Sequence, residues 1–398
     1  MNNIKFLEKY SQHDMMKSIT IEQGNVIDKY ESKLENNATR IIDSNNKMGF
    51  HVSSGKFNEE KSYISAKQNA FTPATIPSVC NKFVNLEYLD DVTPDCSLDE
   101  YSDYLKLKMK GLTGFHSKIA VEESHVITQL ENSYGANTYS DIKRVDIDLE
   151  LRDINTKRLL ISRKYNSRDF IRTIEFLSTI SNIPRITKKI SPKRKKFIIS
   201  PNILLEFLYP LQNLLLKGIS VTNEISKALT IIEDNNGIIQ IPFDDEGIKT
   251  EKKLICKNGN IIPTSFKNLE DGVSSGNGFR KDYRRKPKKA PLIWRVSPGL
   301  ISLDDLTNTL KEYVLIDTMV QGRIDEHSGY LISTVTNSYL IDEGEIKGIL
   351  PPFKIIADPV SLLEDPNLII SKEVEFTEGG DYILPYMLTE QISVLSTL

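Results

Sequence analysis

Histidine and cysteine, the side chains best suited to bind a transition metal, are few and far apart in this sequence. The five histidines are His13, His51, His116, His125 and His327. No two of them lie three to five residues apart, the spacing that places two ligands on one face of a helix. The three cysteines, Cys80, Cys96 and Cys256, also have no close partner. We therefore predict no metal site and no disulfide framework in this chain, which suits a reducing compartment.

Patterns for nucleophilic catalysis or phosphate binding are also missing from the sequence, which has no Gly-x-Ser-x-Gly turn and no Gly-Lys-Ser loop. The glycine-rich residues 272–278 follow no apolar strand, so we interpret them as a flexible loop. Cys256 ends a short apolar run before a turn, which favours a buried strand end over a catalytic thiol. The acidic residues 244–246 precede Gly247 and are interpreted as a solvated turn. We predict no catalytic residue in this chain.

Charge is distributed unevenly along the chain, which has 51 Lys and Arg against 54 Asp and Glu. Residues 185–196 carry seven basic and no acidic side chains, and residues 279–289 carry seven basic side chains and one Asp. These two basic islands could neutralise phosphates, and Tyr283 and Trp294 lie close to the second. Aromatic residues are otherwise sparse there and the rest of the chain is acidic. A linker or interface role is therefore favoured over nucleic-acid binding.

The composition, 39% hydrophobic and 26% charged, is that of a globular protein, and 398 residues suffice for two or three domains. No basic start followed by an apolar core opens the chain, as a signal peptide would require. The most apolar run, residues 198–221, is interrupted by Pro201, Glu206, Pro210 and Lys217, which a membrane-spanning helix would not tolerate. We predict a cytoplasmic protein without a membrane segment.

The N-terminal part has the alternation of antiparallel strands, with turns at Gly24-Asn25 and Asn45-Asn46. Strands are expected over residues 18–22, 26–32, 39–43 and 49–53. A helix over residues 57–71 is expected to end before Pro73, and residues 72–98 to form an irregular connection. A second strand pair is expected in residues 117–153 around a turn at 132–135, followed by a helix within 166–182.

The C-terminal part is expected to open with a buried strand at residues 196–200 and an apolar helix at 201–217, kinked or interrupted at Pro210. Strands and turns then dominate, with helices only at residues 303–313 and 359–364. The predicted class is α+β. An N-terminal α/β sandwich-like domain with antiparallel sheets (residues 1–195) would precede a strand-rich, barrel-like domain (residues 196–398).

A series of short motifs in this order resembles the TldD/PmbA family. In the C-terminal half they are Ile241-Pro-Phe-Asp-Asp-Glu-Gly-Ile-Lys-Thr250, Ser275-Gly-Asn-Gly278, Ser297-Pro-Gly299, Leu315-Ile-Asp-Thr-Met-Val-Gln-Gly322 and Ser338-Tyr-Leu-Ile-Asp-Glu-Gly-Glu-Ile346. In the N-terminal half, Glu131-Asn-Ser-Tyr-Gly135 is similar to the Asn-Ser-x-Gly turn of the family. Each motif is weak alone, but the ordered series covers nearly the whole chain.

The resemblance implies one of two kinds of subunit. TldD-like members carry a His-Glu-x-x-x-His helix and a later Cys that bind zinc, whereas TldE (PmbA)-like members lack them and partner the active subunit. In this chain the corresponding helix, residues 202–213, contains no histidine, and no cysteine follows Cys256. The chain is therefore identified as TldE-like, with zinc expected in a TldD-like partner.

The function implied is a non-catalytic subunit of a metallopeptidase complex that binds unfolded or leader peptides. The resemblance places the peptide groove near Gln321, Gly322, Arg323 and Ser333. One alternative is a modulator that binds nucleic acid or a DNA enzyme through the basic islands. Another is a metal-free hydrolase that uses Cys256.

Overall fold

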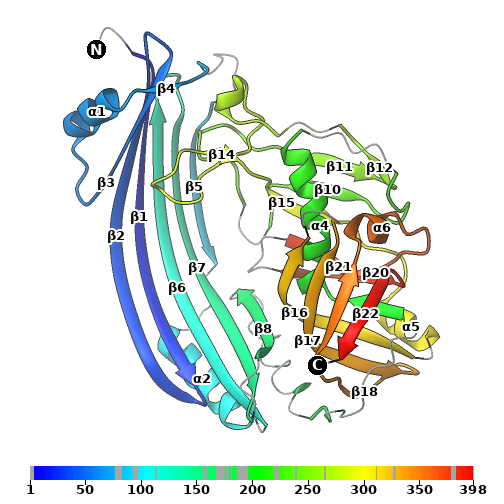
Figure 1. The fold of residues 1–398 in the computed structure, drawn as a ribbon. Coiled ribbons are helices and arrows are strands. Elements are labelled where there is room, and N and C mark those ends of the chain that lie inside the picture. The colour runs from blue at the N-terminus through cyan, green and yellow to red at the C-terminus, as the bar shows by residue number, and fades with distance from the viewer. Residues whose placement is uncertain are drawn as a thin grey trace.

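The computed structural model of the chain describes residues 4–76, 83–92, 97–112, 114–155, 159–166, 175, 179–180, 182–184, 186, 196–218, 224–237, 240–263, 266–310, 312–325, 329–377 and 382–397. It contains two large sheets that lie side by side (Figure 1). The strands of the first sheet end at Asn166, and those of the second begin at Lys196. The domain division at residue 195 falls between these two positions and stays a prediction.

The first sheet has eight strands in the order β4-β3-β2-β1-β6-β7-β5, with β8 beside β7. They are β1 (Ile4–Glu22), β2 (Asn25–Asp43), β3 (Lys47–Ser54), β4 (Thr72–Pro73), β5 (Asn85–Val92), β6 (Phe115–Asn132), β7 (Asn137–Asp153) and β8 (Leu159–Asn166). The predicted hairpins are confirmed, and their strands are much longer than expected. β1 and β2 pair along their length around Gln23 and Gly24, whose positive φ angles suit a tight two-residue turn.

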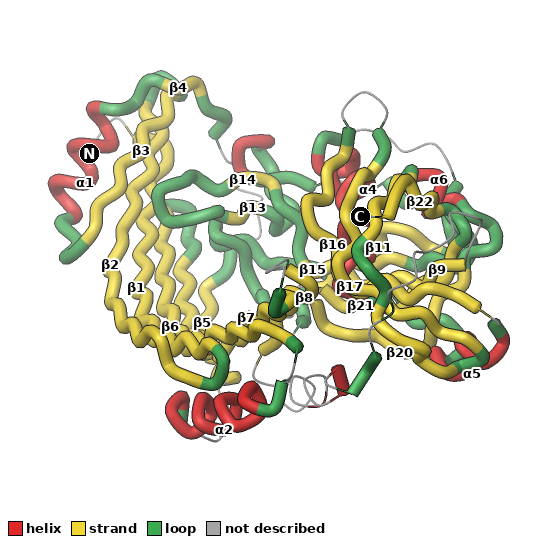
Figure 2. Tube along the Cα trace, turned by 60° about the horizontal axis from the view of Figure 1, so that its bottom comes forward, coloured by secondary structure: helices red, strands yellow, loops and turns green. Residues whose placement is uncertain are grey.

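Two helices pack on this sheet, one near each end of its long strands (Figure 2). The predicted helix α1 (Glu59–Gln68) begins at the cap residue Asn58 and packs on β2 and β3. The helix α2 (Leu98–Lys110) was not predicted, although a capping box between Ser97 and Glu100 starts it. Residues 72–98 were expected to be irregular, but they contain β5, which pairs in parallel with β7. That expectation was wrong for β5. Most of the helix expected within residues 166–182 lies outside the described residues.

The second sheet has twelve strands in the order β12-β11-β10-β15-β21-β9-β16-β17-β19-β22, with β18 beside β17 and β20 beside β21. They are β9 (Lys196–Ile199), β10 (Ile231–Asp234), β11 (Lys253–Lys257), β12 (Asn260–Ile261), β15 (Ile293–Val296), β16 (Glu312–Ile324), β17 (Leu331–Asp342), β18 (Glu345–Ile349), β19 (Phe353–Ala357), β20 (Ile369–Thr377), β21 (Tyr382–Thr389) and β22 (Ile392–Thr397). The short strands β13 (Gly278–Phe279) and β14 (Lys288–Lys289) pair with each other. A 3-10 turn, η2 (Leu269–Asp271), precedes them.

The three helices expected in this half are confirmed as α4 (Pro201–Leu216), α5 (Leu303–Thr309) and α6 (Pro359–Glu364). The helix α4 continues through Pro210, so the interruption allowed there does not occur. The molecule is 17% helical and 54% strand, which confirms the strand-rich α+β class. In the described part of the chain, the twelve strands form an open sheet and not a closed barrel.

The hydrophobic cores connect the two halves. One core surrounds α4 and includes Phe207, Leu208 and Trp294. A second core begins under α2, where Tyr101 and Leu105 pack on the first sheet, and continues into the C-terminal half. Among the described residues, no helix is both long and apolar enough to cross a bilayer.

Candidate functional site

The candidate site lies where β9, α4 and β16 meet (Figures 1 and 2). β9 pairs in parallel with β16 up to Ile316. At Ser200 the chain leaves the sheet: its N–H donates to Ile316 O at 2.9 Å, and its hydroxyl donates to Asp317 O at 3.2 Å. β16 runs on to Ile324, and in the described part of the chain no strand pairs with that edge beyond Ile316. The arrangement leaves a strand edge next to α4.

A β-bulge interrupts β16 at this edge. Val320 lies opposite Thr334 and Arg323 lies opposite Ile332, so Gln321 and Gly322 together face the single residue Ser333. The buried Ser333 hydroxyl donates to Val320 O at 3.1 Å, which holds the bulge from the β17 side.

The structure thus brings together all four residues predicted to bind peptide. Gln321, Gly322 and Arg323 are consecutive on β16, and Ser333 faces the bulge from β17. The side chains of Gln321 and Arg323 lie outside the described residues. The peptide-binding role itself stays a prediction.

The face of α4 near the bulge is polar. Its opposite face packs into the core, whereas Asn202, Glu206 and Tyr209 are half-buried and lie one helical turn apart. A Cβ atom added to Gly322 would lie 3.5 Å from Glu206 Oε2, an ordinary contact, so Glu206 approaches the bulge. Glu206 was not predicted as a site residue. The available signal was a polar position four residues after Asn202 in an otherwise apolar helix.

The polar face of α4 does not suit zinc, because Asn202, Glu206 and Tyr209 offer no imidazole or thiolate. Among the described residues, no group of three or more His, Cys, Asp or Glu could hold a metal ion. Two histidines already have acidic partners: His116 contacts Glu22 at 3.0 Å, and His125 contacts Asp141 at 2.6 Å. That this chain binds no metal stays a prediction.

A lower charge cluster, formed by Arg163, Asp317 and Asn337, lies beneath the site and joins β8 to β16 and β17. Arg163 forms an ion pair with Asp317, and Asn337 Nδ2 donates to the second oxygen of that carboxylate at 2.9 Å. Burial opposes the charge of Arg163, but the Asp317 carboxylate outweighs this and raises the pKa of the guanidinium well above its usual value. The cluster fixes the middle of β16 to β8 of the N-terminal sheet.

An upper charge cluster, formed by Glu8, Arg40, Asp244, Glu246 and Arg280, joins the sheet to the turn before Gly247. Arg40 contacts Glu8 at 2.5 Å and Glu246 at 3.2 Å, and Arg280 contacts Glu8 at 2.6 Å. All of these side chains are buried. The expected solvated acidic turn at residues 244–246 was therefore wrong: Asp244 and Glu246 are buried, with Arg40 beside Glu246 and backbone N–H groups around Asp244.

The carboxylates of the upper charge cluster differ in their partners. Asp244 accepts hydrogen bonds from the backbone N–H groups of Glu246, Ile248 and Gly278 at 2.8–3.0 Å. Glu246 accepts from Leu269 N at 2.7 Å and shares Arg40 with Glu8. Burial raises the pKa of Glu246 to about 8, against the attraction of Arg40. Burial likewise raises the pKa of Asp244 to about 7, so both carboxyls can change charge near neutral pH.

The glycine-rich residues 272–278 belong to this buried region and have a defined conformation. Gly276 has a φ of +75°, and a Cβ atom there would lie 2.5 Å from Lys249 O, so only glycine fits. Asn277 is buried and donates to Glu233 Oε1 at 3.2 Å. The interpretation as a flexible loop missed these contacts.

Cys256 is the buried strand end that the sequence indicated. It lies in β11 with no exposed surface, and its thiol lies 3.6 Å from Leu229 O. Burial raises the pKa of this thiol to about 11. A thiol that stays protonated at neutral pH is a poor nucleophile, which argues against the Cys256 hydrolase.

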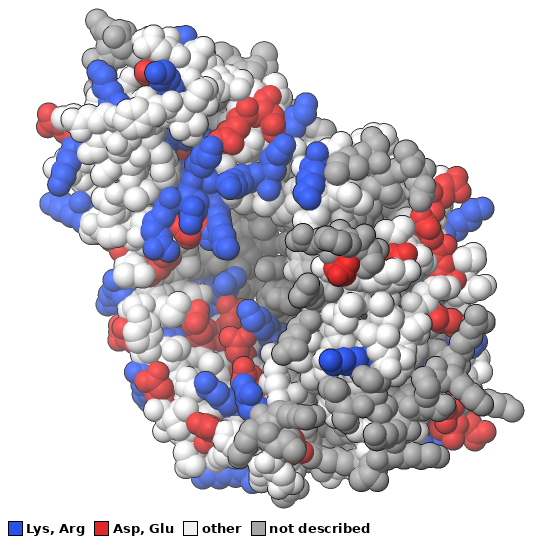
Figure 3. Space-filling model, in the orientation of Figure 1, with Lys and Arg blue, Asp and Glu red and all other residues white. Residues whose placement is uncertain are grey.

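The second basic island lies around β14, and Figure 3 shows Lys and Arg gathered there, where the surface is hollowed between the two halves. Several of these charges have acidic neighbours. Lys286 pairs with Glu270, and Lys289 lies 3.4 Å from Asp271. Arg280 is buried in the upper charge cluster. The first island, residues 185–196, lies outside the described residues except for Ile186 and Lys196.

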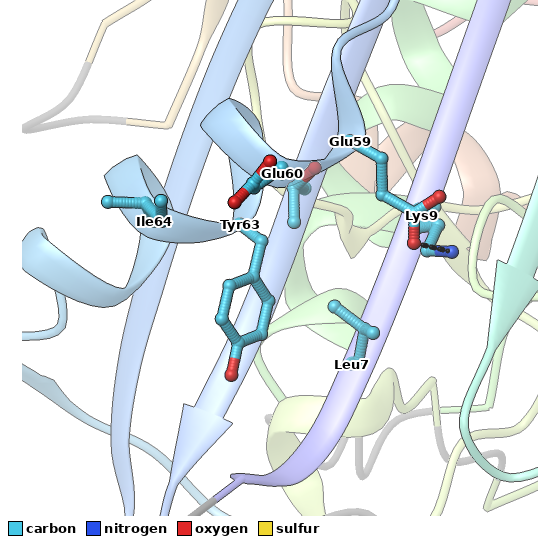
Figure 4. A pocket seen from close by; sticks show the side chains of 7 residues that line it. Leu7, Lys9, Glu59, Glu60, Tyr63 and Ile64 are labelled. Atoms are coloured by element: carbon cyan, nitrogen blue, oxygen red, sulfur yellow. Dashed lines mark ion pairs between the residues drawn. The ribbon is translucent and has the colours of Figure 1, made fainter. Parts of the chain in front are cut away.

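A pocket of about 470 Å³ lies on the opposite face of the first sheet, under α1 (Figure 4). Leu7, Tyr63 and Ile64 give it an apolar wall, and Lys9 pairs with Glu59 at 2.5 Å at its rim. None of its residues belongs to the site beside α4.

Comparison with known proteins agrees with this fold. Residues 215–396 match the family described as the PmbA/TldA metallopeptidase C-terminal domain. A metalloprotease from Archaeoglobus fulgidus is 27% identical over 173 residues, which are 41% of this chain and 39% of that protein. A metalloprotease TldD homolog from Haemophilus influenzae is 25% identical over 146 residues, 35% of this chain and 30% of that protein. The chain thus matches well under half the length of these curated relatives.

Two solved structures match nearly the whole chain. TldE from Thermococcus kodakarensis has a TM-score of 0.81 at 18% identity, over 98% of this chain and 96% of that one. A Thermotoga maritima protein named as a modulator of a DNA gyrase has a TM-score of 0.78 at 17% identity, with the same coverage. At these identities the likeness shows the fold. Together, the match of residues 215–396 and these two folds support membership of the TldD/PmbA family.

Proposed function

We propose that this chain is a TldE-like, non-catalytic subunit that pairs with a zinc-bearing, TldD-like metallopeptidase and helps to hold its peptide substrate. The observation that carries the proposal is the combination found beside α4. An edge of β16 that no described strand pairs with beyond Ile316 carries a bulge at Gln321 and Gly322, and it lies against a helix face without histidine or cysteine.

The strand edge supports peptide binding on physical grounds. An extended peptide can add to a sheet edge through backbone hydrogen bonds, which hold it whatever its side chains. The bulge turns the strand locally and leaves backbone groups out of the regular ladder. Ile324 and Ile332 are more than a third exposed nearby and would contact alternate side chains of the peptide. Such a site would position a substrate while the partner supplies the metal-activated water.

The assignment as the non-catalytic member rests on two independent features. The relatives found by sequence comparison are named metalloproteases. In this chain, α4 instead presents the amide of Asn202, the carboxylate of Glu206 and the phenol of Tyr209. The fold also resembles that of a protein named TldE. A TldD-like partner and a cytoplasmic location are part of the proposal.

Peptide cleavage by the purified chain, alone and mixed with a TldD-like protein, tests the proposal. The chain alone should leave an unfolded peptide intact. The mixture should cleave it, and a zinc chelator should abolish the cleavage. Zinc-dependent cleavage by the isolated chain would overturn the proposal.

The variant Gly322→Val tests the strand edge itself. Its Cβ atom would meet Glu206 and Leu331 only at ordinary contact distances, so the fold should persist. The branched side chain would obstruct the edge, and cleavage by the mixture should fall by at least about 10-fold. Gly111→Val, at the end of α2 where a Cβ atom also makes only an ordinary contact, is the matched control. If both variants reduced cleavage equally, the peptide-binding site would not lie on β16.

Nucleic-acid binding remains the second candidate because Lys281, Arg284 and Lys288 are exposed around β14. Their contribution would show as DNA binding that weakens steeply between low and physiological salt, and that is lost when the three are replaced by Gln. The peptidase-subunit proposal expects no such binding.

A further inference from the structure

The outer edge of β2 has no pairing strand over residues 25–34 in the described part of the chain. β3 pairs with β2 only from Asn36 to Ile42, and Gly55 N–H donates to Glu35 O at 2.7 Å as the last bond on that side. Among the described residues, no strand pairs with residues 25–34 on this side. Figures 1 and 2 both show this part of β2 at the margin of the sheet.

Backbone hydrogen-bonding groups point outward along this edge. Glu35 O points to the β3 side, and backbone groups alternate between the two sides of a strand. The N–H and C=O groups of Lys29, Glu31 and Lys33 therefore point the same way, with no strand beside them in the described structure. Such an edge is a template for another strand.

The side chains of this edge lie on two faces of β2. Tyr30 and Leu34 share one face with Asp28 and Ser32, and Tyr30 and Leu34 are each more than half exposed. A bulge at Ile27 places Val26 on the other face. The other face carries Lys29, Glu31 and Lys33, all exposed. Lys29 also pairs with Asp99 of α2 at 2.8 Å. The sequence of the edge contains no proline to prevent pairing.

We propose that this edge pairs with the same edge of a second copy of the chain, antiparallel and centred on Tyr30. In this register Lys29 of each copy faces Glu31 of the other, and Asp28 faces Ser32. Tyr30 faces Tyr30 across the two-fold axis. Two pairs of opposite charge therefore flank a central aromatic pair.

Neighbouring registers are less favourable. A centre at Lys29 or at Glu31 places two like charges directly opposite each other, which is destabilising. A centre at Ser32 would bring Asp28 against Asn36, which β3 already holds. The midpoint of the unpaired stretch and the centre of the charge-matched register thus coincide at Tyr30.

Charge reversal tests the register, with the dimer dissociation constant of the full chain measured by sedimentation equilibrium. Lys29→Glu and Glu31→Lys should each weaken the dimer by about 10-fold or more, because two attractive pairs become repulsive. The double variant restores both pairs and should recover the wild-type constant. Asp99→Asn, which removes the other partner of Lys29, should leave the dimer dissociation constant unchanged.

Cross-linking tests the symmetry axis directly. Facing residues in a non-hydrogen-bonded antiparallel pair have Cα atoms about 4.5 Å apart, within reach of a disulfide. Tyr30→Cys should therefore form covalent dimers under mild oxidation, whereas Leu34→Cys, which lies four residues from the axis, should behave as the wild type does. A wild-type chain that stays monomeric at all concentrations overturns the proposal. So does a dimer that both single reversals leave intact.

Discussion

The upper and lower charge clusters both join the first sheet to the C-terminal half, but they balance charge differently. In the lower cluster one cation, Arg163, meets one carboxylate, Asp317, and Asn337 supplies the remaining donor. In the upper cluster Glu8 and Glu246 share Arg40, and Arg280 also contacts Glu8. Asp244 accepts backbone hydrogen bonds instead. A buried carboxyl without a cation of its own tends to hold a proton. The lower cluster is thus a matched pair, and the upper one can change its charge with pH.

Removing Arg40 should have the largest effect, because it leaves Glu8 and Glu246 facing each other in the interior. Arg40→Met should lower the free energy of unfolding by about 5 kcal/mol. Urea denaturation measures this, with Lys33→Met on the exposed part of β2 as the control. A loss similar to that of the control would mean that Arg280 alone compensates Glu8.

Removing Arg163 should have a smaller effect, because Asn337 still donates to Asp317. Arg163→Met should lower the free energy of unfolding by about 3 kcal/mol in the same experiment. If this variant proved less stable than Arg40→Met, the lower cluster would be the stronger junction and the comparison would be reversed.

The pH dependence of stability separates the two clusters most sharply. The pKa of Glu246 is raised to about 8 in the folded chain, so the stabilisation from its protonated form is present at low pH and is lost as pH rises through about 8. The side chain in Glu246→Gln stays neutral at every pH. Between pH 5 and 8 the free energy of unfolding of this variant should therefore fall less steeply than that of the wild type, by at most about 1.4 kcal/mol per pH unit.

Thermal unfolding at a series of pH values measures this effect. Glu60→Gln on the surface of α1 is the matched control and should follow the wild-type profile. Parallel profiles for wild type and Glu246→Gln would show that Glu246 is already ionised at pH 5.

Local patterns predicted much of the fold, because alternation and turn residues are local properties. The hairpins of the first sheet follow from residues near Gly24 and Asn46. The helix α2 was also readable, since Tyr101, Leu105 and Met109 recur every four residues. The burial of the acids at residues 244–246 could not be predicted in this way, because it depends on Arg40, about two hundred positions away along the chain.

The candidate site was predictable only in part. Family resemblance indicated residues 321–323 and Ser333, but the bulge that sets two residues against one depends on the register of β16 with β17. The approach of Glu206 to Gly322 depends on how α4 packs on the sheet, and the spacing of residues along the chain does not predict this packing.

The junction at Glu8 limits how this gene could be recombined. Glu8 and Arg280, 272 positions apart in the sequence, neutralise each other in the interior. A hybrid that took its front half from one relative and its back half from another would need both members of this pair to match. Crossovers between the halves should therefore be tolerated only among relatives that share these buried charges.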